Sequence, residues 1–254
     1  MNTPDHCQQK LVWDVPTRLF HWLNAACVLA LMAIGLVILN AGALDVSNDG
    51  KVALKTLHVW IGYVFALNLM MRIVWAFVGG HYARWRQILP GGAGYLSALR
   101  DYLAAFAAGR SEPWLGHNPA GRLAIGVLLI LLTMQAVTGL VLAGTDLFYP
   151  PLGAWIAQSI AAPGVDPSTL VPYATALYDA EAYARMRELR EPVVNLHVWG
   201  FYLLLAMSLL HMIAVVVTEI REGGNLVSAM ITGRKTLRGQ PRDAESDATD
   251  REPG

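Results

Sequence analysis

The charged residues of this chain leave four long stretches almost free of Asp, Glu, Lys and Arg. Each stretch reaches the ~20 residues that a helix needs to cross ~30 Å of hydrocarbon. None shows the polar stripe that a surface helix of a soluble protein carries. The pattern predicts an all-α membrane protein, a four-helix bundle with spans at about 19–41, 56–80, 122–144 and 193–218.

The composition agrees with a multi-pass membrane protein. Of 254 residues, 55% are hydrophobic and 15% are charged, whereas average soluble domains carry about 25% charged residues. The first apolar run follows Lys10, Asp14 and Arg18 without an obvious cleavage site, so we expect a first span rather than a signal peptide. The net charge is zero, so bulk charge predicts no nucleic-acid partner, whereas the apolar spans predict membrane lipid as a partner.

Lysine and arginine are unevenly divided between the two sides of the predicted membrane. Thirteen lie in the N-terminal segment, the loop between spans two and three and the C-terminal segment, whereas five lie in the other two loops. Because cytoplasmic loops carry the excess of Lys and Arg, both termini should be cytoplasmic. We therefore expect a membrane domain over 1–235, a periplasmic loop with short helices over 146–192, and a disordered cytoplasmic tail over 236–254. The loop would be either a surface cap or a docking surface for an external partner.

Four of the seven histidines, His21, His58, His197 and His211, lie inside predicted spans. Ionisable residues are costly at membrane depth and are candidates for function. His197 and His211 are fourteen residues apart, which places them ~21 Å apart along one helix and within ~40° of the same face. The predicted topology then pairs His58 with His197 near the outer side and His21 with His211 near the inner side.

Each histidine pair could hold one planar metal macrocycle from opposite faces. Imidazole suits iron, and axial histidine is a known ligand of haem. Zinc would need three or four ligands at one point, and a proton-coupled transporter would place acids inside its spans, where this chain has none. Two bis-histidine haems are the arrangement that uses all four rings, so we predict a pair of haems that forms an electron path across the membrane. A non-haem transporter or scaffold would leave the four histidines unexplained.

Apart from Arg122 at the start of the third span, Arg72 is the one charged residue inside these spans, and it lies about two turns from the end of its own span. It lies fourteen residues after His58, and hence on the same helix face at the level of the inner pair. One interpretation is a partner for the carboxylates of the inner haem. The other is an arginine that extends to the cytoplasmic interface.

Small and polar residues mark further positions on the predicted helices. Gly35, fourteen residues after His21, would allow a bulky ring to approach closely at the outer level. Gly62 and Gly200 lie one turn or less from the outer histidines and would either face that site or allow helices to pack closely. Gln135 and Thr138 are the polar candidates in span three, for which hydrogen bonds between helices are the default role.

Five segments of the chain carry a resemblance to a known family: "DVPTRLFHW", "LHVWIGY", "GHNPAGR", "NLHVWGFYLLLAMSLLHM" and "EIREGGNLVSAMITGRK". Together they resemble the prokaryotic di-haem b-type cytochromes, and most closely the membrane subunit of Ni–Fe hydrogenases. The resemblance covers nearly the whole chain and implies that His21, His58, His197 and His211 are axial haem ligands. It also implies a subunit that anchors a periplasmic redox enzyme and exchanges electrons with quinone. It further implies a multi-pass protein of the bacterial inner membrane.

The resemblance favours an electron-transfer subunit rather than a catalyst on its own, and we expect no catalytic residue. Its partner would be a periplasmic redox enzyme, with the iron–sulfur small subunit of a Ni–Fe hydrogenase as the first choice, and its exchangeable substrate would be quinone. The alternative is a stand-alone cytochrome b that passes electrons from a small donor, such as superoxide or a soluble cytochrome, to quinone.

Overall fold

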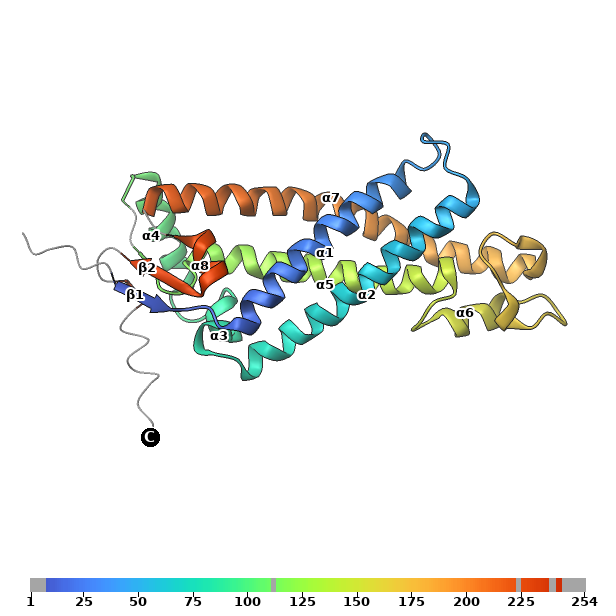
Figure 1. Cartoon of the computed structure of the whole chain (residues 1–254), viewed down its shortest axis with the longest axis horizontal. Helices are drawn as coiled ribbons and strands as arrows, with labels where there is room; N and C mark the ends of the chain where they lie inside the picture. The colour runs from blue at the N-terminus through green and yellow to red at the C-terminus, as the bar shows by residue number, and fades with distance from the viewer. Residues whose placement is uncertain (1–7, 111–112, 223–224, 238–240, 244–254) are drawn as a thin grey trace, which may run out of the picture. The chain divides into compact units, whose positions relative to one another are not determined.

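The computed structural model describes residues 8–110, 113–222, 225–237 and 241–243, and most of them are helical. Its four longest helices, each long and apolar enough to cross a membrane, confirm the four predicted spans (Figure 1). They are α1 (Val15–Leu39), α2 (Asn48–Val78), α5 (Pro119–Leu147) and α7 (Ala180–Glu222).

Two of these helices begin well before the apolar runs that marked them. α2 starts at Asn48, with Asp49 in its first turn, and α7 starts at Ala180, with Glu181 in its first turn. Acidic residues there interact favourably with the positive end of the helix dipole. α7 also continues through Pro192. The apolar pattern marks the part of a helix that suits lipid, so polar helical extensions escape it.

The long helices expose large apolar side chains, which fits contact with lipid. Phe77, Ile130 and Trp199 are 69%, 70% and 72% exposed. Lipid is a solvent for such surfaces, whereas a soluble protein rarely leaves a large apolar patch uncovered.

Shorter elements connect the long helices and close the chain. Between α2 and α5 lie η1 (His81–Ala83), α3 (Trp85–Ile88) and α4 (Tyr95–Ala107). Between α5 and α7, in the segment for which we expected short helices, lie α6 (Gly153–Ile160), η2 (Pro167–Thr169) and η3 (Thr175–Leu177). The last elements are α8 (Leu226–Thr232) and β2 (Arg234–Leu237), which pairs antiparallel with β1 (Gln8–Leu11).

The chain forms two compact units, and each long helix has one end in each of them. Unit 1 contains residues 1–22, 71–129 and 206–254, and unit 2 contains residues 23–70 and 130–205. His21 and His211 therefore belong to unit 1, whereas His58 and His197 belong to unit 2. The division separates the same two pairs that helix geometry and topology separate in the sequence.

In unit 2, α6 packs against the start of α7. Ile156 and Ile160 of α6 form a buried cluster with Tyr178 and Met186. Tyr178 also donates a 2.5 Å hydrogen bond to the Val171 carbonyl. The segment between α5 and α7 thus has its own apolar core.

In unit 1, the residues just before α1 and helix α8 meet the loop before α5. Trp13 and Leu115 are buried together with Ala229 of α8. The ammonium of the buried Lys235 donates to the Trp114 carbonyl at 2.5 Å. Most of the tail over 236–254 lies outside the described part, which omits residues 238–240 and 244–254. Asp243 is described, and its carboxylate accepts hydrogen bonds from the Leu115 and Gly116 amides at 2.7 and 2.8 Å.

Asp14 fixes the start of α1. Its carboxylate accepts hydrogen bonds from the Thr17 amide at 2.9 Å, the Trp75 indole at 3.1 Å and the Gly80 amide at 3.2 Å. Burial raises the pKa of the Asp14 carboxyl, but these hydrogen bonds outweigh burial, so its pKa lies below the usual value. One side chain therefore caps α1 and ties it to the end of α2.

Candidate functional site

Unit 2 contains a cavity of about 480 Å³ between α1, α2, α5 and α7. His58 of α2 and His197 of α7 both line it. Their ring centroids are 6.4 Å apart, and the ring planes are inclined by 73°. The structure therefore brings the predicted outer pair together in one cavity large enough for a sizeable organic ligand.

The orientation of the His197 ring is fixed by Thr138 of α5. The Thr138 hydroxyl lies 2.8 Å from Nδ1 of His197 and 2.7 Å from the Met134 carbonyl. Because the hydroxyl has one proton and the carbonyl can only accept, this proton goes to Met134. Thr138 then accepts from Nδ1–H of His197, and Nε2 keeps its lone pair for another partner.

Gln135 supports the same histidine through the backbone. Its Nε2 donates a 3.2 Å hydrogen bond to the His197 carbonyl. Together with Thr138, this contact confirms the predicted role of the two polar residues of span three as donors or acceptors between helices. Their partner, His197, was not foreseen.

Glycines leave space next to both rings of the pair. A Cβ atom at Gly35 would lie 3.5 Å from Cε1 of His58, and one at Gly139 would lie 3.5 Å from Cε1 of His197. The predicted position of Gly35 at the level of His58 is confirmed. The role of Gly139 was missed, although it follows Thr138 directly in the sequence and so could have been noticed.

The other two candidate glycines differ from each other. Gly62 lines the cavity. Gly200 instead faces α5, where a Cβ would meet Met134 and lie 3.5 Å from the amide carbon of Gln135. For Gly200, close helix packing is therefore the correct interpretation.

His21 and His211 lie near each other in unit 1, close enough for an electrostatic interaction. The His21 ring packs edge-on against Trp22, with centroids 5.2 Å apart. The buried Nδ1 atoms of His21 and of His58 have no hydrogen-bond partner among the described residues. In the described part of the chain, no three His, Cys, Asp or Glu side chains gather as a metal site would need, so the histidines stand in pairs.

Arg72 also lies in unit 1, near the end of α2. Both terminal nitrogens of its guanidinium donate to the Ala83 carbonyl at 3.3 Å. Its charge also interacts with the carboxylate of Asp14. These contacts hold the η1 turn against α2, and they give Arg72 a structural role in addition to any role toward a ligand.

His117, which lies in the loop before α5, is partly buried, and its Nδ1 atom is enclosed with no hydrogen-bond partner among the described residues. Desolvation by burial, together with the charges of Lys235, Arg72 and Arg122, lowers its pKa to about 3. Its ring packs on Trp13 with centroids 4.6 Å apart. A neutral imidazole thus packs inside unit 1, at a position that the sequence did not single out.

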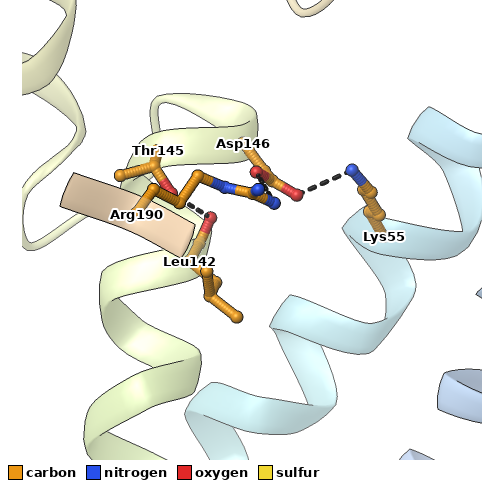
Figure 2. A network of polar contacts seen from close by, with 5 residues as sticks. All are labelled: Lys55, Leu142, Thr145, Asp146 and Arg190. Atoms are coloured by element: carbon orange, nitrogen blue, oxygen red, sulfur yellow. Dashed lines mark hydrogen bonds and ion pairs between the residues drawn. The ribbon is translucent and has the colours of Figure 1, made fainter. Parts of the chain in front are cut away.

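A network of charged side chains lies on the lining of the unit 2 cavity (Figure 2). The carboxylate of Asp146 binds Nζ of Lys55 at 2.6 Å through one oxygen and a terminal nitrogen of Arg190 at 2.5 Å through the other. The three side chains are only 23%, 16% and 18% exposed for Lys55, Asp146 and Arg190. No motif in the sequence marks any of the three.

Known proteins of similar sequence span most of the chain. The family described as "Prokaryotic cytochrome b561" matches residues 12–233. A "Probable Ni/Fe-hydrogenase B-type cytochrome subunit" of Cupriavidus necator is 23% identical over 247 residues, which cover 89% of this chain and 87% of that protein. The protein of the same name from Bradyrhizobium diazoefficiens is 24% identical over 248 residues, with 89% and 86% covered.

Another relative matches a shorter part of the chain with a higher sequence identity. The "Probable Ni/Fe-hydrogenase 1 B-type cytochrome subunit" of Escherichia coli K12 is 31% identical over 150 residues, which cover 54% of this chain and 62% of that protein. No solved structure matches the chain significantly.

The family match over residues 12–233 includes all four long helices and α8. It also includes the four histidines on the long helices. With its four spanning helices, the chain is a multi-pass protein of the bacterial inner membrane. It belongs to the prokaryotic cytochrome b561 family.

Proposed function

We propose that this chain is a di-haem b-type cytochrome that carries electrons between a periplasmic Ni–Fe hydrogenase and the quinone pool. One observation carries the proposal: His58 and His197, from two different helices, line one cavity with ring centroids 6.4 Å apart. The names of the similar proteins support the hydrogenase as partner.

The geometry of the His58–His197 pair fits two axial ligands of one metal. An imidazole nitrogen binds a first-row metal at about 2 Å, so two rings on opposite sides of one metal have centres about 6 Å apart. The glycines at 35 and 139 keep the space beside the rings open for a flat ligand. A b haem in this cavity would supply one-electron redox chemistry at its iron.

Each residue around this pair has a separate task. His58 and His197 would bind the iron. Thr138 holds Nδ1 of His197 as the protonated nitrogen, which leaves Nε2 to bind metal and makes the ring a more basic ligand. Most of the side chains that line the cavity are apolar, which would limit the water around the iron and favour electron transfer.

His21 and His211 would hold the second haem in the same way, in unit 1. Arg72 would pair with a carboxylate of this haem through the guanidinium N–H groups that do not contact Ala83. The spacing of fourteen residues on α7 puts its two histidines ~21 Å apart, so α7 would carry one ligand of each haem and connect the two redox centres.

The positive-inside rule gives the direction of this path across the membrane. Unit 2 and the segment 146–192 would face the periplasm, where the iron–sulfur small subunit of the hydrogenase would dock. Unit 1 and both termini would face the cytoplasm. Quinone would take up two electrons, one at a time, together with two protons, and become quinol.

Purification in mild detergent tests both parts of the proposal. We expect a reducible b-type absorption spectrum and co-purification of hydrogenase subunits. A spectrum without haem would contradict the proposed function. Full quinone reductase activity of the isolated chain with a small donor would instead favour the stand-alone cytochrome.

A further inference from the structure

We propose that Lys55, Arg190 and Asp146 form the subsite that binds the carboxylates of the haem held by His58 and His197. The inference rests on the proposed function and concerns residues that neither the sequence motifs nor the comparisons single out. Its starting point is that three charged side chains in a membrane protein share the lining of one cavity with two histidines.

Helix geometry explains why these side chains and the histidines face the same space. Lys55 lies three residues before His58 on α2, which is one turn along the same face. Arg190 lies seven residues before His197 on α7, which is two turns along nearly the same face. The charged network thus lies one to two turns from the histidine rings.

α5 adds the acidic member by the same rule. Asp146 lies seven residues after Gly139, the glycine that leaves space beside the His197 ring. Three helices therefore each place one residue beside the rings and one charged residue further along, in the direction of the segment 146–192. A flat ligand that lies between the histidines and reaches along the helices would bring one edge to the charged network.

The charges of the lining do not balance. Its charged residues are three cations, Lys51, Lys55 and Arg190, and one carboxylate, Asp146, so two positive charges are in excess. Half-buried charges without counter-charges are costly. A b haem carries two carboxylates on one edge of its ring, which would supply the two missing negative charges.

The hydrogen bonds of the network also leave donors available. Nε of Arg190 is buried and has no hydrogen-bond partner among the described residues. Asp146 uses its two oxygens for Arg190 and Lys55 (Figure 2), so its single negative charge holds two cations in place and neutralises only one of them. Tyr173, which lines the cavity, supports the Lys55 ammonium from its ring face at 5.5 Å from the centroid.

The role of Asp146 separates this inference from a purely structural network. If the three side chains only tie α2, α5 and α7 together, then removal of Asp146 should damage the site as much as removal of either cation. If the cations bind carboxylates, removal of the Asp146 charge leaves them free and should preserve or increase the preference for an anionic ligand.

The experiment compares protohaem with its dimethyl ester, which has the same ring but no carboxylate charge. The full chain carrying His211→Ala, in which the inner site lacks one ligand, is prepared without haem in detergent and titrated with each compound through the Soret band. We expect the free acid to bind about tenfold or more tightly than the ester, as charge-assisted hydrogen bonds allow.

The variants then test individual side chains in this background. Lys55→Met and Arg190→Leu should each reduce the preference for the free acid about tenfold, and Asp146→Asn should keep or raise it. Lys55→Arg keeps the positive charge and should therefore keep the preference for the free acid. If Lys55→Met does not fold, Arg190→Leu still tests the loss of a cation. The matched control is Arg185→Leu, which removes an exposed arginine of α7 that pairs with Glu181 and should change nothing.

Two results would overturn the inference. One is equal affinity for the free acid and the ester in the background protein. The other is a loss of preference in Asp146→Asn as large as that in Lys55→Met. A background protein that forms no bis-histidine spectrum with either compound would instead refute the proposed function itself, so the two failures are distinguishable.

Discussion

The hydroxyl of Thr138 lies 2.8 Å from Nδ1 of His197 and gives its own proton to the Met134 carbonyl. A residue of α5 therefore selects the tautomer of a histidine on α7. For a metal ligand this contact has two effects: it fixes the ring orientation and increases the basicity of Nε2. Thr138 belongs to the span without a histidine, which thus contributes to the site indirectly.

Thr138→Val should weaken the unit 2 haem site without changing its shape, because valine and threonine have nearly the same size. Loss of the Nδ1 hydrogen bond should reduce haem affinity about tenfold. It should also raise the midpoint potential of that haem, because a less basic ligand stabilises oxidised iron less. Redox titration of the optical spectrum measures the potential. Thr145→Val, which removes a hydroxyl that contacts the Leu142 carbonyl at 3.4 Å, is the control, and equal potentials in both variants would argue against the role of Thr138.

Gly35→Leu should prevent haem binding in unit 2. A Cβ at this position lies 3.5 Å from His58, which is ordinary contact, but the branched end of leucine would extend into the cavity. The haem content of the purified variant, measured after extraction, should fall by about one haem per chain. Gly35→Ala adds only the Cβ and should keep both haems, so haem loss in the alanine variant would show that the argument about space is wrong.

His117 should make the protein less stable as the pH falls below neutrality. Burial holds the folded-state pKa at about 3, whereas the unfolded chain takes up a proton near the ordinary value of 6.5. Between these values the unfolded state binds the extra proton, so the free energy of unfolding decreases as the pH is lowered through this window.

The test of His117 is the difference between wild type and His117→Gln. Thermal unfolding in detergent from pH 7 to pH 4.5 should show a steeper loss of stability in the wild type, because glutamine does not titrate. Asp14 does not complicate this window, since its lowered pKa keeps it ionised there. Parallel stability curves for the two proteins would mean that His117 is accessible to protons in the folded state.

The sequence predicted most of the bundle because lipid imposes a simple rule on the parts of a helix that it contacts. The same rule explains what it missed at the helix ends: the polar start of α7 resembles a surface segment by composition, yet it belongs to the same helix as His197. Arg190 and Lys55 therefore resembled charged residues of loops. Both bind Asp146 because three helices lie in a particular register, and no local sequence pattern predicts that register.

For the histidines too, features set within one helix could be predicted from the sequence, whereas contacts between distant segments could not. The spacing between His197 and His211 is a property of one helix, and the pairing of His58 with His197 followed from it together with topology. The enclosure of the His117 Nδ1 atom depends on packing against Trp13, which lies 104 residues earlier in the sequence. No local pattern around "GHNPAGR" distinguishes a buried imidazole from a solvated one.

The number of b haems per chain in single-histidine variants tests the paired arrangement most directly. Extraction and pyridine haemochrome spectra should give two haems for the wild type. His197→Ala and His21→Ala should each retain about one, and the haem that remains should differ in midpoint potential between the two variants. Loss of both haems in either variant, or loss of the same haem in both, would contradict the assignment of one haem to His58 and His197 and the other to His21 and His211.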